Sequence, residues 1–192
     1  MQTTSLQKKG RATMSKTKFT TPKGVAIYPW LQPGRPDTAF DTEGKYKVQL
    51  KMTEAEAKPI MDLIDESKKD NFAAKDKVRL PYDRDEETGE ITFKLQSKYQ
   101  PKYVDSSGSP IPEHQVPLMF GGSELKAKGM LDPYSGSSKG ISMRLSAVQV
   151  INPVAGDGAN ENFDAVDGGY TINSAQGSTN GSTEEEDDDY DF

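Results

Sequence analysis

Hydrophobic and polar residues alternate along two segments of the chain, residues 45–52 and 91–98. In the first segment the apolar positions are Tyr46, Val48, Leu50 and Met52. In the second they are Ile91, Phe93 and Leu95. Successive side chains of a β-strand point to opposite faces of the sheet. Both segments are therefore predicted to be strands with one buried face and one outward face that carries lysines.

Other apolar runs predict further strands. Val25–Tyr28 is a short run rich in β-formers that Pro29 is expected to end. Residues 78–82, 123–130 and 141–151 complete the set, and the charged residues 83–90 predict a hairpin tip that turns at Gly89. In the last segment the apolar parity shifts at Ala147-Val148. This shift predicts a bulge, or a stretch buried on both faces as in a closed barrel.

One helix is predicted between these strands. Thr53 and Glu56 have the spacing of a capping box, and Ile60, Met61, Leu63 and Ile64 follow at helical spacing. Pro59 lies late for a first turn, so we expect the helix to kink there or to begin again with Pro59. Its end is expected near Lys69, with the apolar stripe packed on the sheet.

Five or six short strands with one helix and no alternation of strands and helices predict a mainly β fold. The natural class is a small antiparallel barrel or sandwich, and the five-stranded Greek-key barrel called the OB-fold fits the order of elements. We expect this body to span residues 15–153, after a disordered extension of residues 1–14. Met14-Ser15-Lys16 reads as a second start, which would make residues 1–13 an upstream extension.

The charge of the chain divides sharply near Val154. The residues before it hold all 24 Lys and Arg with 19 of the 30 acids, whereas those from Val154 onward hold the other 11 acids and no base. Such a division predicts a basic body whose partner is a polyanion, and a tail that can imitate that polyanion. The alternative is an acidic tail that only keeps the protein soluble, which would have no need of aromatic residues at its end.

The tail has two expected parts. Residues 154–183 are rich in Gly, Asn and Ser and are predicted to be a flexible linker, with an r.m.s. span of about 30 Å against a body radius of gyration of about 14 Å. The acidic tip could thus reach the basic face of its own body or of a neighbouring copy. The tip consists of Glu184, Glu185, Glu186, Asp187, Asp188, Asp189, Tyr190, Asp191 and Phe192.

Lysines recur on the outward faces of three predicted strands, and aromatic residues interleave with lysines in residues 99–103. Aromatic rings stack on any base while lysines neutralise phosphates, so this pattern favours single-stranded nucleic acid. For each residue alone, a solvated lysine face or a core aromatic is the simpler interpretation; their recurrence favours a binding face. The candidate residues are Trp30, Lys45, Lys47, Lys51, Lys94, Lys98, Tyr99, Lys102, Tyr103, Lys126, Lys128, Tyr134, Lys139 and Arg144.

Several functional classes find no support in the sequence. Without cysteine there is no disulfide framework, thiol nucleophile or cysteine metal site. The acids of residues 83–90 lack the spacing of an EF-hand, and the single histidine, His114, has no partner that would make it a ligand. We therefore expect no metal, no cofactor and no enzymatic activity. A Mg²⁺ nuclease that uses Asp83, Asp85 and Glu87 is disfavoured because these acids lie on a predicted hairpin tip.

No apolar run approaches the roughly 20 residues that span a bilayer, and the first residues lack the apolar core of a secretory signal. We therefore expect an intracellular protein with no membrane partner.

The order of these features resembles the single-stranded DNA-binding proteins of phages with podovirus-type replication genes. The likeness rests on the segment Gly121-Gly122-Ser123-Glu124-Leu125-Lys126, the strand of residues 140–150 and an acidic tail ending in Asp191-Phe192. It covers about residues 15–153 and the tail tip, while the middle of the body diverges.

The resemblance implies binding of single-stranded DNA without sequence specificity during phage replication and recombination, inside the host cell. It also implies a tail whose terminal aromatic docks on the phage DNA polymerase and other replication proteins, and which occupies the DNA-binding face when DNA is absent, often in a homodimer. An RNA-binding or RNA-chaperone module remains the alternative, because a stacking platform does not distinguish the sugars. A protein-interaction module driven by the tail is a third, and it would leave the lysine faces unexplained.

Overall fold

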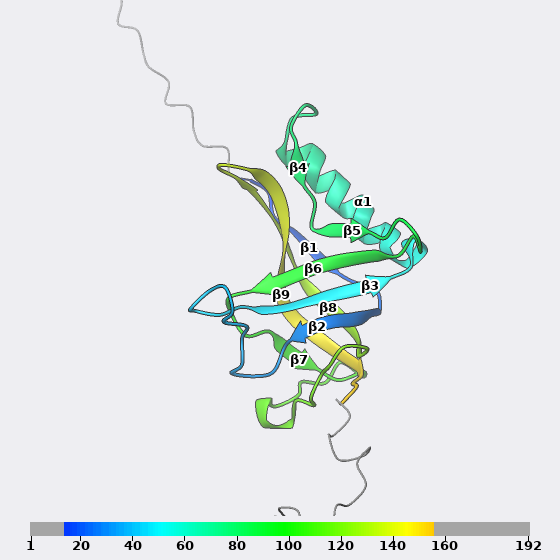
Figure 1. Cartoon of the computed structure of the whole chain (residues 1–192), viewed down its shortest axis with the longest axis vertical. Coiled ribbons are helices and arrows are strands. Elements are labelled where there is room, and N and C mark those ends of the chain that lie inside the picture. The colour runs from blue at the N-terminus through cyan, green and yellow to red at the C-terminus, as the bar shows by residue number, and fades with distance from the viewer. Residues whose placement is uncertain (1–13, 156–192) are drawn as a thin grey trace, which may run out of the picture. The chain divides into compact units, whose positions relative to one another are not determined.

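The computed structural model describes residues 14–155, which form nine strands, one α-helix and one 3₁₀ helix (Figure 1). The strands are β1 (Thr17–Thr20), β2 (Gly24–Trp30), β3 (Tyr46–Met52), β4 (Val78–Arg79), β5 (Tyr82–Arg84), β6 (Ile91–Ser97), β7 (Lys102–Val104), β8 (Glu124–Ser135) and β9 (Lys139–Asn152). The helix α1 spans Glu54–Asn71, and the 3₁₀ helix η1 spans Glu113–Gln115. The predicted mainly β class with a single α-helix is confirmed.

Five of the strands close into a barrel. β2 pairs with β3, β3 with β6 and β2 with β8, all antiparallel. The ring closes because β9 pairs antiparallel with β8 and parallel with β6. Five strands closed by Greek-key connections are the OB-fold architecture. The remaining strands extend this ring, with β1 on β8, β5 on β6, and both β4 and β7 on β9.

The alternating patterns form the core of the barrel as predicted. Tyr46, Val48, Leu50 and Met52 of β3 are buried, and so are Ile91, Phe93 and Leu95 of β6. The outward positions between them keep their polar side chains at the surface. The buried face of each strand therefore determines which residues remain outside for binding.

The helix α1 begins with the predicted capping box. The Thr53 hydroxyl accepts the Glu56 N–H, and the Thr53 N–H donates to the Glu56 carboxylate at 3.1 Å. Ala57, Ile60 and Ile64 are buried in the core cluster, and the helix lies against β1 and β8. α1 is one helix across Pro59 that ends at Asn71, close to the predicted end, so of the two alternatives at Pro59 the restart is wrong. The missing N–H costs one intrahelical bond, which the buried face of the helix offsets.

Several strand boundaries differ from the predictions. β2 continues through Pro29, because its pairing with β3 is already interrupted by a bulge between Ile27 and Trp30 and needs no N–H there. The predicted strand of residues 78–82 is two short strands that separate at Leu80-Pro81 and pair with different partners. β1 and β7 carry too few apolar residues to be predicted.

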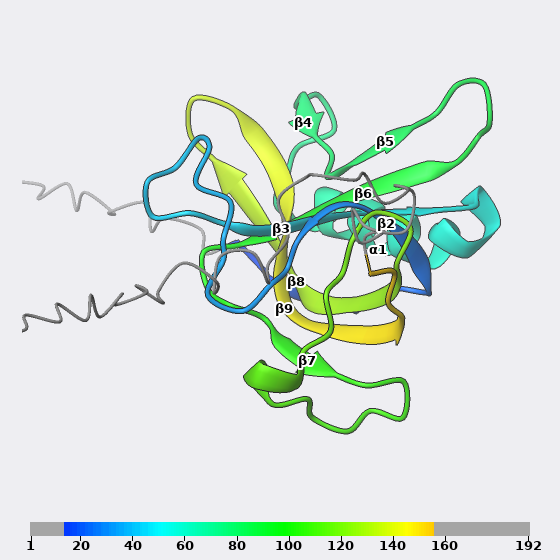
Figure 2. The same cartoon turned by 60° about the horizontal axis from the view of Figure 1, so that its bottom comes forward.

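Residues 132–140, which lie between the predicted strands of residues 123–130 and 141–151 and were expected to be a loop, are mostly strand. β8 and β9 form one long hairpin whose connection is residues 136–138 (Figure 2). Asp132, Pro133 and Tyr134 have the composition of a turn, which misled the interpretation of the sequence. Beyond Leu131, β8 has no second neighbouring strand, and such an edge position tolerates proline.

The predicted irregularity near Ala147-Val148 is confirmed. Lys128 pairs with Ala147 but Gly129 pairs with Leu145, which leaves Ser146 as an extra residue in β9. The buried positions shift accordingly from Leu145 to Val148. Such a bulge increases local twist and helps a sheet to close.

We predict that Gly129→Ala destabilises the fold. A Cβ at residue 129 would lie 1.9 Å from the Arg144 carbonyl oxygen and 2.9 Å from the Phe19 ring, so two backbones at the bulge would have to separate. A loss of about 1–3 kcal/mol in the free energy of unfolding is expected in urea denaturation. Gly136→Ala is the matched control, because no atom lies within 4 Å of that position, and should stay within about 0.5 kcal/mol of the parent. Equal stabilities of the two variants would contradict the close approach.

Candidate nucleic-acid interface

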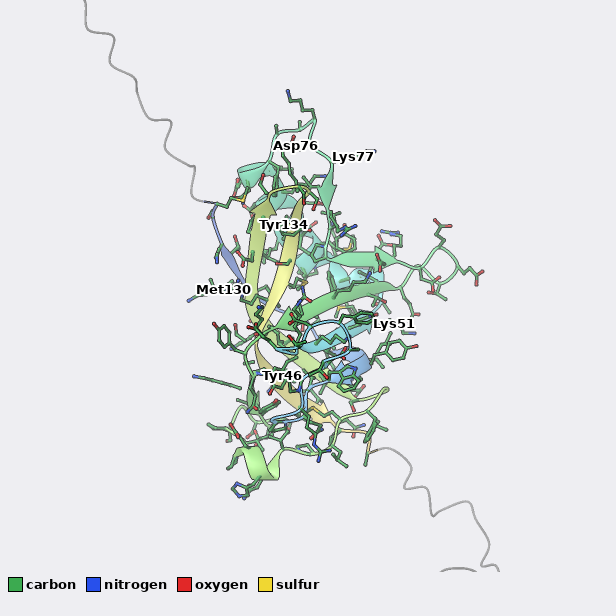
Figure 3. The ribbon with its side chains drawn as sticks, turned by 60° about the vertical axis from the view of Figure 1, so that its left-hand side comes forward. Tyr46, Lys51, Asp76, Lys77, Met130 and Tyr134 are labelled. Atoms are coloured by element: carbon green, nitrogen blue, oxygen red, sulfur yellow. The ribbon has the colours of Figure 1, made fainter. Side chains whose placement is uncertain are left out.

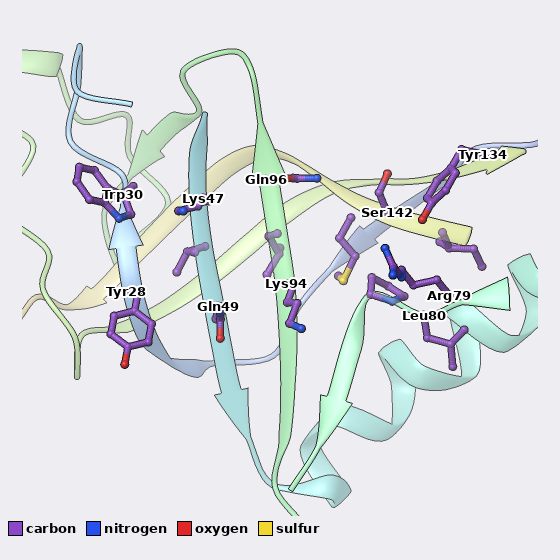
Figure 4. A pocket seen from close by; sticks show the side chains of 15 residues that line it. Tyr28, Trp30, Lys47, Gln49, Arg79, Leu80, Lys94, Gln96, Tyr134 and Ser142 are labelled. Atoms are coloured by element: carbon purple, nitrogen blue, oxygen red, sulfur yellow. The ribbon is translucent and has the colours of Figure 1, made fainter. Parts of the chain in front are cut away.

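A groove of about 790 Å³ crosses the outward faces of β3 and β6 (Figure 4). Aromatic side chains stand at both ends, Tyr28 and Trp30 of β2 at one and Tyr134 of β8 at the other. Polar side chains line the groove between these ends. They are Lys47 and Gln49 of β3, Lys94 and Gln96 of β6, Ser142 of β9 and Arg79 of β4. The groove therefore combines stacking surfaces with cations on one face of the barrel.

Tyr134 is held in place by a glycine on the neighbouring strand. It pairs across the β8–β9 hairpin with Gly140, near the tip of that hairpin (Figure 3). A Cβ on Gly140 would lie 2.3 Å from the Tyr134 hydroxyl oxygen and 2.4 Å from Cζ. The ring thus covers the glycine backbone, as aromatic residues often do beside a glycine in a sheet. The packing fixes one face of the ring while Tyr134 remains 37% exposed.

A smaller and more polar hollow of about 340 Å³ continues the groove. Gln96 and Ser142 line both hollows, so the two are adjacent. Lys45, Lys98, Tyr99 and Arg144 line the second hollow. Together the two hollows contain five cations and three aromatic residues from the predicted set, at the positions where OB-folds present strands and loops to oligonucleotides. These residues are Lys45, Lys47, Lys94, Lys98, Arg144, Trp30, Tyr99 and Tyr134.

The structure places the other predicted residues elsewhere. Lys51 borders a third, apolar hollow on the far side of Tyr28 and Trp30. Lys102, Lys126, Lys128 and Lys139 line none of the three hollows. Tyr103 was also predicted to stack on a base. This prediction is wrong, because the ring of Tyr103 lies in the core.

Tyr103 is only 4% exposed, and its hydroxyl donates to the Leu31 carbonyl oxygen at 2.6 Å. Burial raises the pKa of the Tyr103 phenol. A ring that packs on the core has no face for a base, so Tyr103 does not belong to the candidate interface. Its apolar neighbours come from distant segments, which the sequence pattern of residues 99–103 did not show.

The interpretation of the sequence missed several groove residues. Gln49 and Gln96 occupy the same outward positions as the lysines, so strict alternation along β3 and β6 would have found them. Tyr28 and Arg79 had no such signal. A bulge turns Tyr28 outward, and Arg79 reaches the groove because β4 pairs with β9.

Most groove cations are already paired with a carboxylate of the same chain. In the loop between β2 and β3, Asp37 binds Lys47, Asp41 binds Lys45 at 3.3 Å and Glu43 binds Lys98 at 2.7 Å. Elsewhere Asp83 binds Lys94, Glu90 binds Lys51 at 3.0 Å, Asp132 binds Arg144 and Asp76 binds Lys139 at 2.6 Å. The hydrogen bond from Lys45 lowers the pKa of Asp41, and that to Glu43 raises the pKa of Lys98.

The pairs Lys94–Asp83 and Lys98–Glu43 are exposed on both sides. Exposed ion pairs contribute about 0–1 kcal/mol each, so a phosphate could displace these two carboxylates at little cost. Asp37 is buried, so its displacement from Lys47 would cost more. Arg35 and Arg79 make no ion pair within residues 14–155, and they are available to a phosphate without displacement.

Three other expectations concern the described residues. Asp85 accepts the backbone N–H groups of Glu87 and Thr88, so the acids of residues 83–90 form the predicted hairpin tip. Within residues 14–155 no group of three or more acids or histidines could hold a metal ion. No helix in that part of the chain is long and apolar enough to cross a membrane.

Solved structures similar to this chain come from phage single-stranded DNA-binding proteins. The crystal structure of gp2.5, a single-stranded DNA-binding protein encoded by bacteriophage T7, matches with a TM-score of 0.62 and 24% identity over 82% of this chain and 99% of that one. The C-terminally truncated protein of bacteriophage Enc34 matches with a TM-score of 0.54 and 18% identity, over 72% and 87% of the two chains. The Enc34 protein in complex with single-stranded DNA matches with a TM-score of 0.54 and 17% identity, over 73% and 89%.

No protein-family model and no curated protein sequence matches the chain. At these identities the structural likeness establishes a shared fold. The resemblance that the sequence predicted is therefore confirmed for the fold of the body.

The Asp37→Asn variant tests the ion pair at the groove edge through the pH dependence of stability. Asp37 is 7% exposed, and hydrogen bonds from Lys47 and from the Ala39 N–H lower the pKa of its carboxyl below the usual value for aspartate. The folded state therefore binds this proton less readily than the unfolded state. The stability that Asp37 contributes should be complete above about pH 4 and should disappear as the pH falls through the lowered pKa.

We expect Asp37→Asn to be less stable than the parent at pH 6, and the difference to shrink toward pH 2 in thermal or urea denaturation. Asp62→Asn is the matched control, because its pair with Lys58 is exposed on α1. That variant should match the parent at every pH. A constant gap between the parent and Asp37→Asn across this range would contradict the assignment.

Proposed function

We propose that this protein binds single-stranded DNA without sequence specificity in the groove across β3 and β6. The observation that carries the proposal is the placement of Tyr28, Trp30 and Tyr134 at the two ends of a groove lined with lysine, arginine and glutamine. Aromatic faces accept any base, and cations follow the phosphates of the backbone. The similar phage proteins bind single-stranded DNA, which supports the same role for this fold here.

The stacking surfaces of the groove suit a single strand better than a duplex. Its stacking surfaces are the faces of Trp30 and Tyr134, and only unstacked bases can reach such faces. We propose that the protein coats and protects single strands during phage DNA replication and recombination, within the host cell. This is a binding role, which requires no catalytic group.

DNA that binds in the groove would have to displace the loop carboxylates from the lysines. Phosphates would replace Asp37, Asp41 and Glu43 on the lysines of β3 and β6. Because each phosphate takes over a cation that was already paired, the salt dependence of binding should be weaker than the number of contacted phosphates alone predicts.

Two variants test the groove by titration with oligo(dT), followed by anisotropy and by quenching of Trp30 fluorescence. Tyr134→Ala should weaken binding about 5- to 100-fold with an unchanged salt slope, because it removes one stacked base. Lys94→Gln should lower the slope of log K against log salt by up to about 0.7, the value for one phosphate of a single strand.

Lys58→Gln is the matched control for Lys94→Gln, because Lys58 is also paired with an acid but lies on α1, away from the groove. It should bind like the parent. Parental affinity and parental salt slope for both groove variants would refute the proposed site. Competition between matched oligo(dT) and oligo(rU) decides between DNA binding and the RNA-binding alternative.

The acidic tip of residues 184–192 lies outside the described residues, and its role is a further part of the proposal. Its charge is opposite to that of the body, so we propose that it competes with DNA for the lysines of its own body or of a second copy. We also propose that its aromatic end docks replication proteins, among them the phage polymerase.

Deletion of residues 184–192 should tighten binding of single-stranded DNA at low salt and change it little at high salt, where the competing attraction is screened. The same variant should lose the capture of the polymerase that the full chain achieves. Filter binding at 20 and 300 mM salt and a pull-down measure the two effects. Unchanged affinity at low salt would exclude competition, and undiminished capture would exclude docking.

A further inference from the structure

A third hollow of about 800 Å³ adjoins the groove on the other side of Tyr28 and Trp30. Its walls are mainly apolar, and it contains an unusual gathering of large exposed hydrophobic side chains. These are Val25, Tyr28, Trp30, Leu118 and Phe120, which are 38%, 74%, 46%, 53% and 47% exposed. A contiguous apolar surface of this kind on a water-soluble barrel marks a place where something binds.

Tyr28 and Trp30 line both the groove and this apolar hollow. They therefore form a ridge, called here the Tyr28–Trp30 ridge, with one hollow on each side. Figure 4 shows both side chains standing outward from β2 at the edge of the groove. A strand that lies in the groove meets this ridge at the end of the lysine row.

The ridge exists because the backbone at Tyr28 adopts a costly conformation. Its φ of 46° is the only positive φ of a non-glycine residue within residues 14–155. Ala26 faces the core, and strict alternation would place Tyr28 on the same buried side. The bulge between Ile27 and Trp30 instead turns Tyr28 outward, beside Trp30. Such strained residues are concentrated at binding sites, where the surrounding structure holds them in place.

The opposite wall of the hollow is held by hydrogen bonds. The Phe120 N–H donates to the Val154 carbonyl oxygen at 3.0 Å, and the Gly122 N–H donates to the Ala26 carbonyl oxygen at 2.9 Å. Met119 is buried, whereas its neighbours Leu118 and Phe120 are exposed. The apolar surface is thus preformed and does not need to be ordered when a ligand binds.

Two cations stand at the rim of this apolar hollow. Arg35 and Lys51 line it, and Arg35 has no ion-pair partner within residues 14–155. Apolar walls with a guanidinium beside them suit a ligand that has flat apolar rings and an anionic backbone. A single strand already seated in the adjacent groove has both.

We propose that the apolar hollow takes up nucleobases of the same single strand that occupies the groove, so that the strand crosses the Tyr28–Trp30 ridge. This inference rests on the proposed function and adds a second, largely uncharged part to the binding site. Stacking on Phe120 and the ridge is independent of base identity, and burial of apolar surface does not depend on salt.

The test is Phe120→Ala, because Phe120 lines the apolar hollow but not the groove. It should weaken binding of long oligo(dT) by about fivefold or more with an unchanged salt slope. The shortest oligomers that still bind to the groove should bind to Phe120→Ala as they bind to the parent, because they need not cross the ridge. Phe40→Ala is the matched control, since Phe40 is 96% exposed but lines none of these hollows, and it should bind like the parent at every length.

A second readout does not depend on affinity. In a Trp30→Phe background, Phe120→Trp places the only tryptophan in the apolar hollow. Its fluorescence should be quenched by long oligo(dT) and not by the shortest binding oligomers. Quenching by both lengths alike would contradict the order of the two sites along the strand.

The outcomes separate this inference from the function on which it rests. If Tyr134→Ala weakens binding while Phe120→Ala binds like the parent at all lengths, the groove binds DNA and the apolar hollow does not. If Phe120→Ala tightens binding at low salt, as deletion of residues 184–192 should, the hollow holds the tail instead and the inference is wrong. If the parent binds no oligo(dT), the proposed function itself fails.

Discussion

Closure of the barrel through β9 is the constraint on which the rest of the structure depends. This strand pairs with β8 along its length, with β6 near its middle, and with the short strands β4 and β7 at its two ends. One strand can serve so many partners only if it twists strongly, and the extra residue Ser146 opposite Gly129 provides that twist. The missing side chain at Gly129 lets the two backbones approach at this point.

The same closure places the candidate interface. The parallel pair of β6 and β9 brings Ser142 beside Gln96, and the parallel pair of β4 and β9 brings Arg79 to the end of the groove. The long β8–β9 hairpin carries Tyr134 to the same end, where Gly140 supports its ring. Residues as far apart in the chain as Tyr28 and Ser142 thus form one surface.

The electrostatics of this surface differ from those of a simple basic patch. The four lysines that line the two hollows each have a carboxylate partner, on the loop between β2 and β3 for Lys45, Lys47 and Lys98 and on β5 for Lys94. The surface is therefore neutralised locally although the body carries an excess of bases. Binding of a polyanion then becomes an exchange of one set of anions for another. An acidic tail would act on the same lysines as the loops do, from a greater distance along the chain.

How much the sequence predicts depends on the range of the interaction. Alternation along β3 and β6, the capping box of α1 and the parity shift in β9 are local patterns, so the sequence by itself determined the fold class, the buried faces and the lysine rows. It also determined the division of charge between body and tail. Only the tertiary structure decided the placement of three tyrosines. The hydroxyl of Tyr103 reaches a distant carbonyl oxygen, a bulge turns Tyr28 outward, and a glycine on the next strand supports Tyr134. Nothing in the local sequence distinguishes these three cases. The carboxylate partners of the lysines were decided in the same way, because folding alone brings the loops onto the strands that they neutralise.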